Sequence, residues 1–111
     1  MIDLIIKNAK VATASDVFNC DIGIDKEKIV FLEKDSSKEA KQVIDAKNQY
    51  VLPGGVDGHC HLDQRTKDGT EMSDNFESGS RSAVFGGTTT VMPFAIQFKG
   101  ESLREVIDEY H

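Results

Sequence analysis

The stretch Val51–Leu62, VLPGGVDGHCHL, decides how the rest of the chain is interpreted. It begins with a short apolar run, turns at Pro-Gly-Gly and re-enters an extended segment that ends in two histidines. Residues i and i+2 of a strand point to the same face, so His59 and His61 are expected side by side, with Cys60 on the opposite face. The spacing therefore predicts two imidazoles that are able to bind one cation together.

The histidine pair is a candidate metal site because neutral imidazole is a good ligand for zinc and similar divalent ions. A strand also fixes both side chains, so they lose little conformational freedom on binding. The alternative is a pair of hydrogen-bonded or solvated histidines at a strand end, which is the commoner case for an isolated pair. Cys60 is interpreted as a small core residue, with a third ligand as the alternative. Asp57 is either an acceptor for a histidine N–H or a strand-end hydrogen-bonding group.

Composition excludes several classes of function. The chain has 111 residues and a formal net charge of −6, and no basic cluster interrupts the acidic balance, so binding to nucleic acid or to an anionic membrane is not expected. The segment Met1–Lys7 has a short apolar run with an early acid, which is typical neither of a signal peptide nor of a membrane span. We therefore expect a cytoplasmic protein in which the two cysteines, Cys20 and Cys60, form no disulfide framework.

The first fifty residues have the alternating apolar pattern of β-strands. A polar turn at Asp25–Lys28 predicts a hairpin between the strands on either side of it. No helix is interposed, so we expect closely spaced antiparallel strands in a small sheet or half a sandwich. The expected strands are Ile2–Lys7, Lys10–Ala12, Ile22–Asp25, Ile29–Leu32, Gln42–Asp45 and Tyr50–Leu52.

Beyond the histidines, strands alternate with helices. The polar segment Leu62–Thr70 is long enough to be a functional loop. Asp74 and Glu77 fit a capping box that begins a helix, and Gly86-Gly87 ends it. The small residues of this helix are expected to let it lie close against a strand; they are Gly79, Ser80 and Ala83.

The β-branched run Thr88–Phe94 predicts a second strand, and a second capping box at Ser102 and Glu105 begins another helix. The order β, α, β, α implies a parallel sheet. In barrels built this way the active site lies at the carboxyl ends of the strands, where His59 and His61 fall. A full (β/α)8 barrel needs about 250 residues, so this chain holds only its start.

Two motifs carry a family resemblance. The Pro-Gly turn followed by an apolar residue, Asp and His-x-His resembles the first barrel strand of the amidohydrolase superfamily, and Gly86–Val91, GGTTTV, is similar to the second. The resemblance implies an α/β chain in two parts. Residues 1–53 would form a partial β-sandwich that other residues of the protein complete, and residues 54–111 would form the first βαβα units of a TIM-like (β/α)8 barrel, incomplete in this chain.

The loop after the histidines separates branches of the superfamily. Dihydroorotases and allantoinases typically carry Arg two residues after the second histidine, where Asp63 stands here. The run Phe76–Ala83, FESGSRSA, also resembles hydantoinases and dihydropyrimidinases, which open cyclic amides or ureides. Asp63, Gln64 and Arg65 are candidates for the substrate loop, with ordinary solvated loop residues as the alternative, above all for Arg65.

The resemblance also implies a mechanism, in which a metal-bound hydroxide attacks the ring amide of a small cyclic substrate. It implies zinc, with two ions per site, and His59 and His61 as ligands of the more buried ion. The remaining ligands and the catalytic residues would lie beyond His111, so residues 1–111 alone are expected to be inactive. It further implies a homo-oligomer, as a tetramer. Two alternatives stay open, a non-catalytic dihydropyrimidinase-related assembly protein, which typically lacks these histidines, and another metal hydrolase or deaminase of the superfamily.

Overall fold

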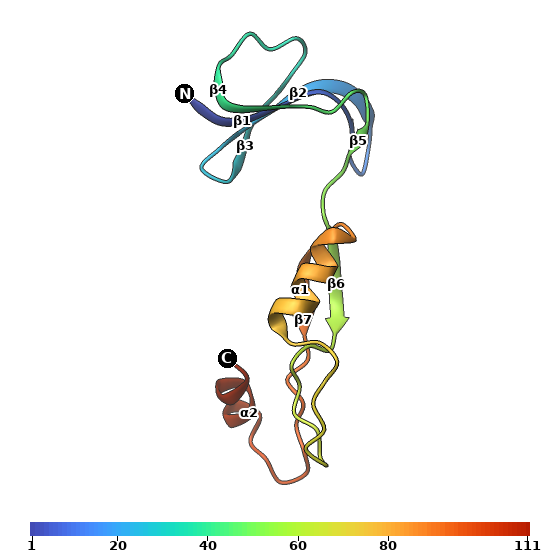
Figure 1. Cartoon of the computed structure of the whole chain (residues 1–111), viewed down its shortest axis with the longest axis vertical. Coiled ribbons are helices and arrows are strands. Elements are labelled where there is room, and N and C mark those ends of the chain that lie inside the picture. The colour runs from blue at the N-terminus through green and yellow to red at the C-terminus, as the bar shows by residue number, and fades with distance from the viewer. The chain divides into compact units, whose positions relative to one another are not determined.

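We describe the fold from a computed structural model that covers all residues from Met1 to His111. The chain divides into two units, Met1–Pro53 and Gly54–His111. Figure 1 shows that the first unit consists of strands alone and that both helices belong to the second.

The first unit is a five-stranded sheet in the order β3-β2-β1-β4, with the short strand β5 also paired to β1. β2 and β3 form the expected antiparallel hairpin, and this prediction is confirmed. Lys26 and Glu27 at its turn have φ angles of 47° and 64°, the left-handed values that tight hairpin turns use. The strands are β1 Ile2–Ala12, β2 Val17–Asp25, β3 Lys28–Glu33, β4 Ala40–Asp45 and β5 Tyr50–Val51.

Two expectations for this sheet are wrong. β4 and β5 pair with β1 in parallel, whereas antiparallel pairing was expected, because the segment after β3 carries the chain to the other side of β1 before β4 begins. β1 is also one strand where two were expected. Its register with β2 shifts between Ile6 and Ala9, at Asn8 with φ of 54°, and the Asn8 N–H donates to Asp21 Oδ1 at 3.0 Å.

The core of the first unit is small. Ile5 is fully buried, and a separate cluster of buried residues consists of Ala9, Val11, Cys20, Ile22 and Ala46. Cys20 is free and buried, as expected for strand packing, and burial raises the pKa of its thiol. Apolar side chains on the outer strands remain exposed, for example Ile29 at 67% and Val43 at 55%. This sheet therefore has apolar surface that the residues of the chain do not cover.

The second unit follows the expected order of strand, helix, strand, helix. Its two strands pair in parallel, which confirms the expected parallel arrangement. Together with the first unit this makes an α/β chain whose amino-terminal part is rich in β-sheet. The elements are β6 Gly55–Cys60, α1 Phe76–Phe85, β7 Thr88–Pro93 and α2 Leu103–Tyr110.

Neither of the two expected capping boxes is present in the structure with the residues expected for it. The residue that caps α1 is Asn75 rather than Asp74, and it forms the box with Ser78 rather than Glu77. Asn75 Oδ1 accepts from the Ser78 N–H at 2.9 Å, and Ser78 Oγ accepts from the Asn75 N–H at 3.1 Å. Ser102 does begin α2, but its side chain makes no capping hydrogen bond. Asp and Asn are both good N-cap residues, and here the two are adjacent. The pattern therefore placed the cap of α1 one residue too early.

Gly79 is the buried residue of α1. A Cβ atom at this position would collide with the side chain of Leu62, which is itself 8% exposed. The small residues of this helix were expected to let it lie close against a strand, and α1 does contact β7. Gly79 itself makes room for the first loop residue beyond the histidines. Leu62 also meets α2, because its carbonyl oxygen accepts from the Tyr110 hydroxyl, and the Tyr110 ring lies 5.3 Å from that of Phe76. Leu62 therefore anchors the loop to both helices.

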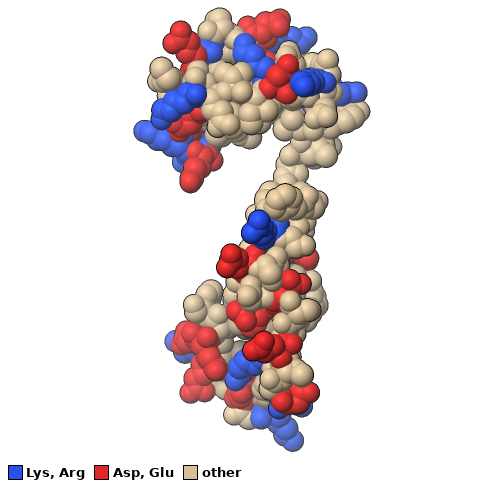
Figure 2. Space-filling model, in the orientation of Figure 1, with Lys and Arg blue, Asp and Glu red and all other residues tan.

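Acidic charge is concentrated in the second unit, which has ten acidic and five basic residues against nine and eight in the first. On the face drawn in Figure 2, red side chains outnumber blue ones over the second unit, and the blue ones are scattered. Neither helix has the length and apolar character of a membrane-spanning segment.

Candidate metal centre

The two histidines lie where β6 ends. His59 is the penultimate residue of the strand and His61 is the first residue after it. Their ring centroids are 5.3 Å apart, with an angle of 50° between the ring planes. Both side chains are exposed, so both rings are accessible from outside the chain. The i, i+2 spacing thus brings two imidazoles together at the carboxyl end of a parallel strand.

Phe94 packs against both imidazoles. Its ring centroid lies 4.2 Å from that of His59, at 30°, and 5.7 Å from that of His61, at 21°. Phe94 directly follows β7, and its backbone N–H donates to the Cys60 carbonyl at 3.0 Å, which continues the pairing of the two strands. The position of Phe94 was not predicted from the sequence. The signal that points to it is the register, because Pro93 pairs with Cys60 and places the next residue beside the histidines.

Gln64 connects His61 to Phe94. Its Oε1 lies 2.8 Å from His61 Nδ1, and its Nε2 donates to the backbone carbonyl of Phe94. Gln64 was a candidate for contact with substrate, but its amide is engaged at both ends within the chain. Gln64 therefore contacts one member of the histidine pair, His61.

Asp57 and Cys60 supply no further ligand beside the pair. Asp57 Oδ1 accepts from the His59 backbone N–H at 3.0 Å, so of its two expected roles the structure shows the strand-end hydrogen bond. Cys60 is half-buried and free. No group of three or more His, Cys, Asp or Glu side chains in residues 1–111 is arranged to hold a metal ion. The chain brings together two candidate ligands.

Arg65, a candidate for the substrate loop, is paired with two carboxylates of the chain. Its guanidinium contacts Glu101 through Nη1–Oε1 at 3.1 Å and Nη2–Oε2 at 2.9 Å, and Nη1 is 3.2 Å from Glu109 Oε2. The hydrogen bond to Glu101 raises the pKa of Arg65. Local sequence gave no sign of these partners because they lie 36 and more residues away. Arg65 instead ties the loop to α2 and the segment before it.

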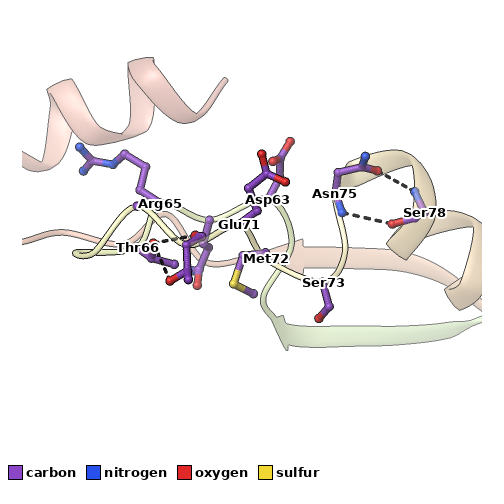
Figure 3. A pocket seen from close by; sticks show the side chains of 11 residues that line it. Asp63, Arg65, Thr66, Glu71, Met72, Ser73, Asn75 and Ser78 are labelled. Carbon is purple, nitrogen blue, oxygen red and sulfur yellow. Dashed lines mark hydrogen bonds between the residues drawn. The ribbon is translucent and has the colours of Figure 1, made fainter.

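A cavity of about 760 Å³ lies within the loop that follows the histidines, and Asp63 is on its wall. The Asp63 backbone has φ of 49°, and its N–H donates to the Asp74 carbonyl at 3.0 Å, which closes the loop at its base. Figure 3 shows the cavity bordered by the start of α1, where Asn75 and Ser78 exchange their two hydrogen bonds. Its lining residues also include Gln64, Thr66, Thr70, Glu71 and Met72.

Comparison with known proteins gives consistent relatives in sequence and in structure. The chain is 42% identical over 107 residues to a D-hydantoinase of Geobacillus stearothermophilus, covering 96% of this chain and 22% of that protein. It is 36% identical over 108 residues to a dihydropyrimidinase of Dictyostelium discoideum, covering 96% and 21%. The crystal structure of dihydropyrimidinase from Brevibacillus agri matches with a TM-score of 0.89 and 45% identity, covering 100% and 24%. No family model matches the sequence.

The parallel strands with the histidine pair at the end of the first define a chain of the amidohydrolase type. Within that superfamily, the chain belongs to the family of hydantoinases and dihydropyrimidinases. It spans between a fifth and a quarter of the length of the relatives described above.

Proposed function

We propose that the protein containing this chain is a metal-dependent hydrolase that opens the ring amide of hydantoins or dihydropyrimidines. The observation that carries the proposal is the pair of accessible imidazoles, 5.3 Å apart, at the carboxyl end of β6. The names of the relatives supply the substrate class, since they are hydantoinases and dihydropyrimidinases.

The donor set fits a divalent cation. Imidazole nitrogen is a ligand that zinc and neighbouring metals accept readily, and two such rings within one short segment lose little freedom on binding. Catalytic zinc sites in proteins use three protein ligands, so the proposal requires further ligands from residues outside 1–111. When bound, the cation supplies a water whose pKa falls to about 7 and a Lewis acid that polarises the amide carbonyl. We propose zinc, with two ions, as the resemblance implies.

The other residues of the site shape it. Phe94 packs against one side of both rings. The cavity beside Asp63 has a volume within the range of small-molecule sites, roughly 300–1,000 Å³, and we propose it as part of the path by which the cyclic substrate reaches the histidines. Arg65 also lines this cavity, and its guanidinium is held there by Glu101 and Glu109.

We further propose that Met1–Pro53 is part of a β-sandwich and that Gly54–His111 begins a (β/α)8 barrel. Exposed apolar side chains on one face of β3 and β4, such as Ile29 and Ile44, support a second layer over this sheet. The parallel pair β6 and β7 with its connecting helix supports the barrel. Assembly into a tetramer and a cytoplasmic location stay predictions.

The test uses the full-length protein with His59→Ala and His61→Ala combined. We expect bound metal to be lost, and ring opening of hydantoin and dihydrouracil to fall by more than the roughly 10–100-fold typical of residues that only support a ligand. The matched control is His111→Ala, which removes an exposed imidazole that follows α2. A double variant that keeps both metal and activity would overturn the assignment.

A further inference from the structure

We infer that Gln64 is a positioning residue that fixes the tautomer of His61, so that Nε2 is the ring nitrogen left with a free lone pair. The consequence for metal binding rests on the proposed function. The tautomer itself is a property of this chain and can be measured without any metal.

The first step is the orientation of the Gln64 amide. One end of the amide faces the backbone carbonyl of Phe94, and a carbonyl oxygen can only accept. The NH2 group must therefore point at Phe94. The oxygen of the amide is then the atom 2.8 Å from His61 Nδ1.

The second step is the imidazole. An amide oxygen opposite Nδ1 requires a proton on that nitrogen, and a neutral imidazole carries only one N–H. Nε2 of His61 is then unprotonated. Metal-binding histidines commonly donate the other ring N–H to an oxygen acceptor, which fixes the ring orientation and raises the basicity of the ligating nitrogen. Gln64 places an acceptor of this kind at His61.

The third step is the rigidity of the acceptor. Phe94 is held to β6 through its N–H bond to the Cys60 carbonyl at 3.0 Å, so the carbonyl that orients the amide is fixed to the strand that ends at the histidines. On either side of Gln64, the Asp63 N–H bonds the Asp74 carbonyl and Arg65 is held by Glu101. A flexible loop side chain would not fix a tautomer, whereas this one is restrained at its amide and at both neighbours.

His59 provides an internal comparison. Its ring packs on Phe94 at 4.2 Å, whereas the Gln64 amide bonds to His61. A change at Gln64 should therefore alter the tautomer of His61 and leave that of His59 as it was. A general loss of order at the site would instead change the tautomers of both histidines.

The experiment is ¹⁵N NMR of histidine-labelled full-length protein, stripped of metal, at about pH 8, where an ordinary imidazole is neutral. The resonances of His61 are identified by their loss in His61→Gln. We expect a protonated Nδ1 and an unprotonated Nε2 in the wild type, and a mixture of both tautomers in Gln64→Met, which keeps the length of the side chain and removes its hydrogen bonds. Gln97→Met is the matched control, since the Gln97 amide donates to the Glu101 carbonyl at 2.7 Å instead.

The second readout is the affinity for Zn²⁺ alone, measured by competition with a chelator. Gln64→Met should weaken it by roughly 10–100-fold, and Gln97→Met should leave it unchanged. A wild-type His61 protonated on Nε2, or a tautomer that is the same in Gln64→Met, would overturn the inference. If the tautomer changes as expected while the His59, His61 double variant still binds metal, the proposed function fails and the role of Gln64 in fixing the tautomer stands.

Discussion

Arg65 and Glu101 form two parallel hydrogen bonds, Nη1 to Oε1 at 3.1 Å and Nη2 to Oε2 at 2.9 Å. This geometry matches the planar guanidinium to the planar carboxylate and is specific to arginine. The bonds join the loop that follows the histidines to the segment that precedes α2. The loop that carries Gln64 is therefore held in place by a contact between residues far apart in the sequence.

Replacement of Arg65 should loosen this loop. In Arg65→Met the backbone amides of residues 62–75 should exchange with solvent severalfold faster, and Arg65→Lys should recover only part of the protection because an ammonium group cannot form both bonds. Hydrogen exchange read by peptide mass spectrometry measures this directly. Arg81→Met, on an exposed position of α1, is the control. Equal exchange rates in Arg65→Met and wild type would show that the contact between Arg65 and Glu101 does not restrain the loop.

The same contact predicts a dependence on pH. The Phe98 N–H and Arg65 both bond the Glu101 carboxylate and lower its pKa from the ordinary value of 4.5. A carboxyl group whose pKa is lower in the folded state stabilises that state above its unfolded pKa, and this contribution is lost as the pH falls through the folded pKa. The difference in loop protection between wild type and Glu101→Gln should thus be full at neutral pH and shrink below pH 4.5. A difference that stays constant through the acid range would contradict this.

Asn75 rather than Asp74 should be the residue that stabilises the start of α1. Loss of a side-chain cap costs about 1 kcal/mol, so Asn75→Ala should lower the free energy of local opening of the first turn by about that amount. Asp74→Ala should cost less, since Asp74 Oδ1 accepts only from the Ser78 hydroxyl, at 2.8 Å. Native-state hydrogen exchange of the α1 amides in the two variants compares them. A larger loss of opening free energy in Asp74→Ala would contradict this prediction and identify Asp74 as the cap, as expected from the sequence.

Gly79→Ala should destabilise α1 although alanine is the better helix former. The gain in helix propensity is about 1 kcal/mol, whereas overpacking of a buried position costs about 1–3 kcal/mol, so we expect a net loss of about 1 kcal/mol. The added Cβ would collide with Leu62, and Gly79→Ala combined with Leu62→Ala should relieve that collision. Ser80→Ala, on the exposed side of the helix, is the control. Denaturant titrations of the three variants and the wild type provide the measurement, and a Gly79→Ala protein as stable as Ser80→Ala would argue against the close contact.

Local pattern was sufficient to predict the features that depend on neighbouring residues. The i, i+2 rule predicted the proximity of the two imidazoles, and strand alternation around a polar turn predicted the β2–β3 hairpin. The parallel pairing of β4 with β1 was not predictable in this way, since it depends on the path of a connecting loop. The same holds for Arg65, whose partners are distant in sequence, and for Phe94, whose position follows from strand register.

We propose that the imidazoles of His59 and His61 hold a cation together. The most direct measurement is an anomalous difference map at the zinc edge, from crystals of the full-length protein grown with Zn²⁺. We predict a peak about 2.0–2.1 Å from one ring nitrogen of each histidine, with Nε2 as that nitrogen in His61. A metal-loaded protein whose anomalous peaks all lie away from both rings would contradict the account.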